Sequence, residues 1–307
     1  MSQSRTGRAI LFANPRSGQA RRWLFSVVEE ARKQGVELAS THFDLEPQSV
    51  ARALSAAREA GIDVVLVAGG DGTIGSVAQH LINTDFILGV LPAGTSNDFA
   101  RSLLVPLSPP EALAVISRGV VSRVDVGKIG NRYFLHAATV GINSAFARAA
   151  QDLRDRFGRV SYPLAWAGVY RARKTFCATL TFEGGERELQ GYEVALVNAP
   201  VYGGALELEI AGADLTDHRL QVVVIEDLEL THLLRTLPLA LWRQRIRFPE
   251  VDRLHVQSGT LSTNPPLSIT TDGEVAGETP ADFSVLPGAL RVFVPMNFLG
   301  DERAAAV

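Results

Sequence analysis

The fold is decided by residues 62–73, which read IDVVLVAGGDGT in the 307-residue sequence. Residues 62–68 form a nearly continuous apolar run, typical of a strand buried on both faces of a parallel sheet. The glycine-rich turn Gly69–Thr73 follows, and a helix is expected from about Ile74. Glycines let a phosphate approach the backbone, a helix start offers N–H groups, and Asp71 adds a carboxylate suited to magnesium. Because ligands bind at the carboxyl ends of parallel strands, a phosphate site is favoured over a plain turn.

The residues around this stretch alternate between strand-like and helix-like segments. Further strands are expected at Arg8–Ala13, Glu37–Phe43 and Phe86–Leu91. Helices are expected at Ala20–Gln34 and at Ser49–Ala60, with Ser49 as the N-cap of the second. This alternation builds a parallel sheet covered by helices, so the first 122 residues are predicted to form an α/β domain.

Two more polar loops are expected at the same edge of this sheet. After the strand near residue 90 the chain reads LPAGTSNDFAR, in which Gly94 permits close approach, Thr95 and Asn97 are short polar residues, and Asp98 is a second acid. Asn97 or Asp98 would also serve as an ordinary helix cap. The first strand ends in NPRSG, where Arg16 could face phosphates. Together the loops favour one shared anion and metal site.

The second part of the chain, 123–307, alternates apolar and polar residues and is broken by glycine and proline signals typical of antiparallel strands. Its last segment could return to pack on the first domain. A hairpin is expected from 123–129 and 133–140, joined at Gly130-Asn131. Further elements are expected as strands at 177–182, 193–197 and 220–225, helices at 145–174 and 229–247, and alternating segments at 254–295.

The composition excludes several classes of protein. A net charge of -3 and a pI near 6.1 disfavour a nucleic-acid partner. None of the three lysines stands in a GxxxxGK[ST] context, which excludes a Walker A loop. Cys177 is the single cysteine, so a reducing compartment, the cytoplasm, is expected. No signal peptide and no run of about 18 apolar residues is present, so no transmembrane segment is predicted.

The order of NPRSG, GGDGT, GTSNDFAR and a later DGE resembles the diacylglycerol-kinase-like lipid kinases, particularly the soluble bacterial YegS/BmrU type. The blocks VDVGKIGNRYF, NAPVYGG and DGEVAGETPADFSVLPGALRVFVP also match in order, so the resemblance covers nearly the whole chain. In that family an NAD kinase-like α/β nucleotide lobe precedes an antiparallel β-sandwich lobe, with ATP in the cleft between them. The resemblance therefore implies an ATP- and magnesium-dependent kinase acting on a hydroxyl of a diacylglycerol-like lipid.

The resemblance also assigns roles to residues of this chain. Asp272 is our choice of general base, because a carboxylate beside the attacking hydroxyl can accept its proton, and Glu274 is the alternative. A plain hairpin turn competes with both at this position. A carboxylate, water and magnesium network is implied for Asp71, Asp98, Asp125 and Glu274. ATP contacts are implied for Asn14, Ser17, Gly18, Thr41, Gly69, Gly70, Asp71, Gly72, Thr73, Gly94, Thr95 and Asn97.

Two positions depart from the family pattern. Gly75-Ser76 replaces the usual Asn-Glu after the glycine turn, which removes an amide and an acid near the nucleotide. Asp217-His218-Arg219-Leu220 replaces the usual Asp-Gly-Leu. A structural magnesium held by Asp217 and the carbonyls of Leu220 and Val222 is therefore one interpretation, and a solvated loop acid is the other.

A lipid kinase would work at a membrane surface without spanning it. Two stretches rich in arginine and large apolar residues, 154–174 and 232–247, could dock there, although core packing with a solvated basic face is the favoured interpretation. A soluble-substrate kinase of the NAD kinase type and a non-catalytic nucleotide- or lipid-binding regulator are the competing functions. The sequence leaves the acceptor and the oligomeric state open, a homodimer included.

Overall fold

The computed structural model describes residues 7–14, 27–118, 120–142, 174–202, 208–210, 212–226, 246–247 and 254–299. The chain divides into two compact units. The first holds the described residues up to Asp125 together with those from Pro287 onward, and the second holds those between Val126 and Leu286. Among the described residues, no helix is both long enough and apolar enough to cross a membrane.

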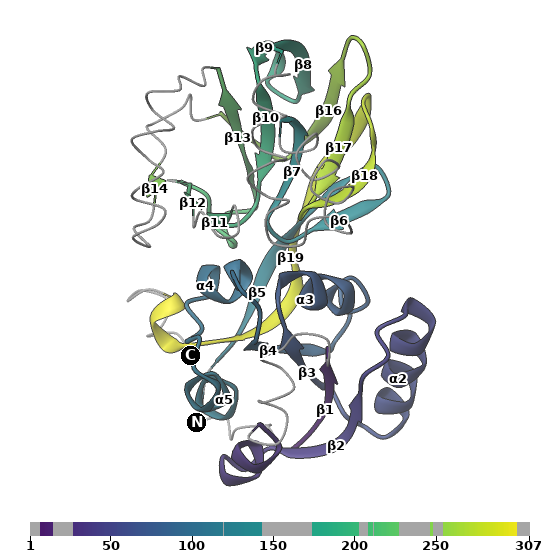
Figure 1. Ribbon diagram of the computed structural model, residues 1–307, viewed down its shortest axis with the longest axis vertical. Helices are drawn as coiled ribbons and strands as arrows, with labels where there is room; N and C mark the ends of the chain where they lie inside the picture. The colour runs from purple at the N-terminus through teal and green to yellow at the C-terminus, as the bar shows by residue number, and fades with distance from the viewer. Residues whose placement is uncertain are drawn as a thin grey trace, which may run out of the picture. The chain divides into compact units, whose positions relative to one another are not determined.

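The first unit is built on a parallel sheet with the strand order β2-β1-β3-β4, and the end of β19 adds to β4 in the same direction. Its two central strands, β3 and β4, are buried along their whole length, as the apolar runs predict. Helices α2 and α5 lie on opposite faces of this sheet (Figure 1). The bounds are β1 Arg8–Ala13, β2 Glu37–His42, α2 Pro47–Glu59, β3 Val64–Gly69, α3 Asp71–Ala78, β4 Ile87–Pro92, α4 Asp98–Ser102 and α5 Pro109–Arg118.

Two helices of this unit begin earlier than predicted. Helix α2 starts at Pro47 with Glu46 as its N-cap, so the assignment of Ser49 as the cap is wrong. Proline fits the first helical position because its fixed φ is helical and the missing N–H would have no partner there. Helix α3 starts at Asp71 instead of near Ile74, with Gly70 as an extended N-cap residue. Asp71 therefore lies in the first turn of the helix.

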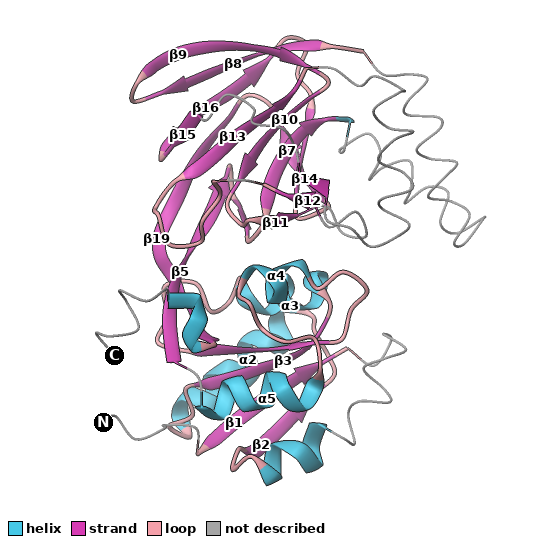
Figure 2. Ribbon diagram, turned by 90° about the vertical axis from the view of Figure 1, so that its left-hand side faces the viewer, coloured by secondary structure: helices cyan, strands magenta, loops and turns pink. Residues whose placement is uncertain are grey.

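The second unit is a β-sandwich. One layer is the antiparallel sheet β15-β13-β10-β7-β17-β18, and the other contains β16, β8 and β9 with the parts of β5, β6 and β19 that belong to this unit (Figure 2). The bounds are β5 Val120–Ile129, β6 Arg132–Phe134, β7 Ala137–Gly141, β8 Phe176–Phe182, β9 Gly185–Gly191, β10 Glu193–Val197, β11 Val201–Tyr202, β12 Leu208–Glu209, β13 Leu220–Ile225, β14 Ile246–Arg247, β15 Leu254–Val256, β16 Ser258–Thr263, β17 Ser268–Thr271, β18 Glu274–Glu278 and β19 Ala281–Val294, followed by the short 3-10 helix η3 Met296–Leu299.

Strand β10 shows how this unit buries side chains on both faces of a sheet. Val194 and Leu196 point into the core between the two layers, where they join residues such as Leu180 and Leu261. The alternate residues of β10 pack into a smaller cluster on the other face. Successive side chains of a strand point to opposite faces, so burial on both sides explains why all five residues of β10 are buried.

The predicted hairpin between 123–129 and 133–140 is only half correct. Strand β6 ends at Phe134, and β7 begins at Ala137 in the opposite layer. At this break the N–H groups of Leu135 and His136 donate to the Asp272 carboxylate, and their carbonyls accept from the side chain and the backbone of Asn198, so neither residue pairs with a neighbouring strand.

One other prediction changes, because Ile246–Arg247 is a short strand instead of a helix end. The predicted strand at 177–182 is present as β8, on which Cys177 is exposed. The rest of the predicted helix 229–247 and all but Lys174 of the predicted helix 145–174 lie outside the described residues.

Candidate active site

Two glycine-containing loops meet at the carboxyl edge of the parallel sheet in the first unit. A Cβ atom added to Gly94 would lie 2.4 Å from the Cα of Gly70, and one added to Gly69 would lie 2.5 Å from the side chain of Thr73. No real side chain tolerates such contacts, so Gly94 allows the two loops to touch through their backbones, and Gly69 allows Thr73 to pack on its own turn. The predicted juxtaposition of the loops after β3 and β4 is therefore present.

Side chains of both loops fix this arrangement. Oδ1 of Asp71 accepts a hydrogen bond from the backbone N–H of Phe99 at 3.0 Å, which joins the glycine turn to the first turn of α4. Oδ1 of Asn97 accepts from the N–H of Gly94 at 2.8 Å, and its Nδ2 donates to the Gly94 carbonyl at 3.0 Å. Asn97 is thus held by its own loop, and in the left-handed conformation it precedes α4 without capping it by its side chain.

The end of the first strand joins the same edge. Nδ2 of Asn14 donates to Oγ1 of Thr73 at 3.4 Å, and the Asn14 N–H donates to the Ala68 carbonyl. Thr95 is exposed in the second loop, and Thr41 is half-buried on β2 opposite Leu11. The predicted contacts Ser17 and Gly18, with Arg16 beside them, lie outside the described residues.

Gly72 differs from its neighbours in the glycine turn. No atom lies within 4 Å of a Cβ built on it, and its φ is not in the left-handed region. Neither packing nor backbone conformation therefore requires glycine at this position. Gly72 is in the first turn of α3, where helix N–H groups lack intrahelical partners. This turn is open to a ligand that approaches the backbone, and an anion suits it best.

The acids of the first unit do not form a preassembled metal cage. Asp98 is only 6% exposed, and Asp125 is fully buried, with Oδ1 accepting from the Gly288 N–H at 2.7 Å. Gly288 lies within β19 and has a φ of +55°, so Asp125 bonds to the backbone of this strand at a residue in the left-handed conformation. Among the residues that the structure describes, no group of three His, Cys, Asp or Glu is placed to hold one metal ion.

The proposed second metal site lies around Asp217. Its Oδ1 accepts from the backbone N–H of Arg219 at 3.0 Å, which is the geometry of a local turn. Leu220 and Val222 are buried in β13, which pairs with both β10 and β15. The turn bond of Asp217 fits an ordinary loop acid next to β13. A magnesium ion at this position stays a prediction.

The DGE motif of the second unit is a hairpin turn between β17 and β18. Thr271 pairs with Glu274, and the two residues between them have φ values of +49° and +88°, as in a type I′ turn. Both carboxylate oxygens of Asp272 bond to the segment before β7. Oδ2 accepts from the N–H of Leu135 at 2.7 Å, and Oδ1 accepts from the next two N–H groups at 2.9 and 3.1 Å. Asp272 is therefore an anchor for backbone.

A second motif holds the same segment from its other side. Asn198 is fully buried; its Nδ2 donates to the Leu135 carbonyl at 2.9 Å, and its N–H donates to the His136 carbonyl at 2.8 Å. Asn198 was not predicted as a site residue, and the only signal for it in the sequence is the NAPVYGG block. The DGE and NAPVYGG motifs together position the chain between β6 and β7.

Glu274 and Asp272 are both exposed, but their hydrogen bonds differ. The Glu274 side chain is 69% exposed and pairs with Arg132 at the start of β6, with Nη2 of the arginine 3.5 Å from Oε2. A carboxylate with one exposed partner can still receive a proton from a substrate, whereas one held by three N–H groups has little room to do so. Arg132 was also missed by the sequence-based prediction.

Comparisons with known proteins match both units of the chain. Residues 8–129 match the model of the diacylglycerol kinase catalytic domain, and residues 136–294 match that of the YegS C-terminal NAD kinase beta sandwich-like domain. The chain is 28% identical over 300 residues to a diacylglycerol kinase of Mycobacterium tuberculosis, covering 95% of this chain and 96% of that protein. It is also 28% identical over 302 residues to one of Staphylococcus aureus, covering 96% and 95%.

Solved structures show the same fold. A crystal structure of a diacylglycerol kinase from Bacillus anthracis superposes with a TM-score of 0.75 at 22% identity, covering 95% of this chain and 98% of that one. A second structure from the same organism gives a TM-score of 0.73 at 23% identity. The predicted class, a mostly parallel α/β sheet with an antiparallel β-sandwich, is confirmed.

Proposed function

This chain belongs to the diacylglycerol kinase catalytic-domain family, of the YegS type, and is a lipid kinase; we propose that it transfers the γ-phosphoryl group of ATP to a free hydroxyl of a diacylglycerol-like lipid, with magnesium. The observation that carries the proposal is the open first turn of α3 at Gly72, which Asp71 joins to the first turn of α4. Because the acceptor lies in a bilayer, the enzyme would act at a membrane surface.

The first unit binds the nucleotide in this proposal. The phosphates lie on the turn from Gly70 to Thr73, where close backbone approach and helix N–H groups favour an anion. In this proposal the nucleotide also contacts Asn14, which follows β1, and Thr95, which follows β4. Gly75 leaves open space where the family pattern has asparagine, and the Ser76 hydroxyl turns back to the Gly72 carbonyl at 2.8 Å. Nucleotide binding here therefore relies on backbone more than on side chains.

Magnesium bound with ATP neutralises charge on the transferring phosphoryl group. Magnesium in such sites usually keeps several waters and takes one or two carboxylates plus substrate phosphates, so a three-acid cage is not required. We assign this role to Asp71, half-buried in the first turn of α3, and to Asp98, the buried first residue of α4. Asp125 is fully buried and accepts from the Gly288 N–H, so we assign it a structural role in holding the backbone of β19.

The second unit supplies the base. The acceptor oxygen attacks the γ-phosphorus, its proton passes to the Glu274 carboxylate, and the bond from the γ-phosphorus to the bridging oxygen breaks to release ADP. Arg132 holds the Glu274 carboxylate before the acceptor arrives. Asp272 keeps the segment from Leu135 to Ala137 in place, so we assign it a positioning role and prefer Glu274 as the proton acceptor.

The test is phosphate transfer from γ-labelled ATP to diacylglycerol in mixed vesicles, with and without magnesium. Glu274→Gln should lower kcat by at least about 100-fold, the usual range for losing a general base, while nucleotide affinity stays unchanged. Glu186→Gln on the exposed edge strand β9 is the matched control and should keep full activity. Failure of the wild-type protein to label any lipid hydroxyl would refute the proposed function. Equal activity of Glu274→Gln and Glu186→Gln would refute only the base.

A further inference from the structure

The second unit contains a pocket of about 590 Å³ that has no role in the phosphoryl transfer proposed above. It lies between the β5–β6 hairpin on one side and β17, β18 and the start of β19 on the other. This volume is within the range of about 300–1,000 Å³ typical of small-molecule sites. All its lining residues belong to one unit, so its shape is set by the sandwich alone.

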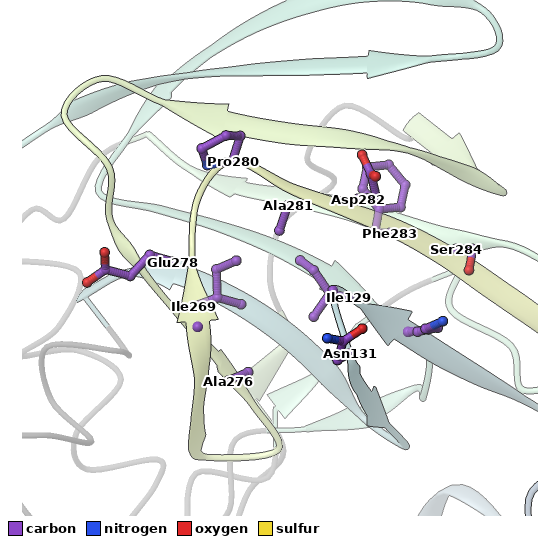
Figure 3. Close-up of a pocket in the computed structure, with 13 residues that line it drawn as sticks. Ile129, Asn131, Ile269, Ala276, Glu278, Pro280, Ala281, Asp282, Phe283 and Ser284 are labelled. Atoms are coloured by element: carbon purple, nitrogen blue, oxygen red, sulfur yellow. The ribbon is translucent and has the colours of Figure 1, made fainter.

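The floor of the pocket is apolar. Ile129, Ile269 and Phe283 are each at most 3% exposed and belong to the core between the two layers. In Figure 3, Ile269 and Ala276 approach from one side and Ile129 from the other. Strand β18 carries a bulge here, because Ile269 pairs with Gly277 whereas Thr270 pairs with Val275, which leaves Ala276 without an opposite residue. The bulge places Ala276 at the pocket.

The rim of the pocket is polar and carries both signs of charge. Lys128 contributes one positive charge, and Glu278 and Asp282 contribute two negative charges. Asp282 is fixed, since its carboxylate accepts from the Thr260 hydroxyl at 2.7 Å and its carbonyl accepts from the Gly130 N–H at 2.8 Å. An apolar floor below a rim with one excess negative charge suits an uncharged amphiphile better than an anionic one.

The pocket adjoins the proposed base through two short connections. Asn131, on the rim, is followed directly by Arg132, which pairs with Glu274. On the opposite wall, Ala276 stands two residues after Glu274 on the same strand. A molecule whose hydrocarbon lies on the pocket floor therefore has a polar end within a few residues of the carboxylate that would take its proton.

We infer that this pocket binds the acceptor lipid, an uncharged amphiphile of the diacylglycerol class, with the hydrocarbon next to the headgroup on Ile129, Ile269, Ala276 and Phe283 and its hydroxyl directed toward Glu274. This inference rests on the proposed function. It adds the location of the acceptor and a preference for a neutral one over phosphatidylglycerol.

Filling the pocket tests the inference. Ala276→Phe places a ring on the floor, and Asn131→Phe narrows the pocket from the hairpin turn on the opposite wall. Each should raise KM for diacylglycerol in vesicles by about tenfold or more, because the lost contacts bind the acceptor equally well in the ground state and in the transition state. The Kd for ATP should stay unchanged. Val275→Phe is the matched control, since Val275 is exposed on the same strand and does not line the pocket. Thermal unfolding of all three variants checks that they fold.

A readout without catalysis completes the test. A diacylglycerol with a photoreactive diazirine on the first carbons of one chain should label residues 128–131 or 276–284 in the wild-type protein and lose this labelling in Ala276→Phe. Labelling elsewhere would overturn the inference, as would equal KM values for Ala276→Phe and Val275→Phe. Efficient transfer to phosphatidylglycerol and none to diacylglycerol would overturn the neutral preference. If no lipid is phosphorylated but these residues are labelled, the proposed reaction fails and the lipid site stands.

Discussion

The two motifs with the strongest sequence signals, GGDGT in the first unit and DGE in the second, use their acids in different ways. Oδ1 of Asp71 accepts from the N–H of Phe99, and Asp71 is half-buried in the first turn of α3. Asp272 gives both oxygens to three consecutive N–H groups. The acid with chemical freedom in the second motif is its neighbour Glu274. Motif membership therefore does not separate acids that act on a substrate from acids that hold the backbone, whereas their hydrogen bonds do.

The largest expected effect is the loss of stability on removing the Asp272 carboxylate. Asp272→Ala leaves the N–H groups of Leu135, His136 and Ala137 without their acceptor in a buried segment. At about 1–3 kcal/mol for each unsatisfied donor, the free energy of unfolding should fall by at least about 3 kcal/mol. Glu274→Ala removes only an exposed ion pair and should cost less than about 1 kcal/mol. Chemical denaturation of both variants measures the difference, and similar losses would contradict the assignment of the anchor.

The features that could be predicted from the sequence are those set by residues close together in the chain. The buried strands and the glycine turn follow from continuous apolar runs and from three glycines in five residues, so they could be predicted. The start of α2 was missed because Pro47 sets it, two residues before the serine that looks like a cap. The partners of Asp272 lie more than 130 residues away in the chain, and no local pattern reveals a bond over that separation. Asn198 and Arg132 were missed for the same reason.

A smaller difference in stability and in nucleotide affinity is expected between substitutions of the tightly packed Gly94 and of the open Gly72. Gly94→Ala forces a Cβ against the Cα of Gly70, so overpacking should cost about 1–3 kcal/mol and weaken nucleotide binding through the distorted loop. Gly72→Ala meets open space inside a helix, where alanine is favoured by about 1 kcal/mol. It should therefore retain or raise thermal stability while its methyl group blocks phosphate approach.

The two variants can be compared by calorimetric unfolding and by titration with ATP. We expect Gly94→Ala to lose both stability and affinity and Gly72→Ala to lose affinity alone. Unchanged ATP affinity in a well-folded Gly72→Ala would remove the reason to place phosphates on this turn. Unchanged stability of Gly94→Ala would show that the loops can separate without cost.

The smallest expected effect is the pH dependence of stability that comes from His42, at the end of β2 next to Thr41. Its ring lies 5.2 Å from that of Phe12, and Nε2 is 2.8 Å from the Ser40 hydroxyl. Partial burial lowers the pKa of His42 below its ordinary value of 6.5, because desolvation disfavours the charged ring. The unfolded chain therefore takes up this proton first as the pH falls. Stability from His42 is complete above about pH 6.5 and declines below it until the folded ring also protonates.

His42→Gln keeps a hydrogen-bonding group near Ser40 but removes the titration. Between about pH 8 and about pH 5 the Tm of the wild-type protein should fall slightly more than the Tm of this variant, since the carboxylates that titrate in both proteins cancel in the comparison. An identical fall for His42→Gln and the wild type would show that protonating this ring does not cost folding energy, and the edge of the sheet beside Thr41 would then tolerate a positive charge.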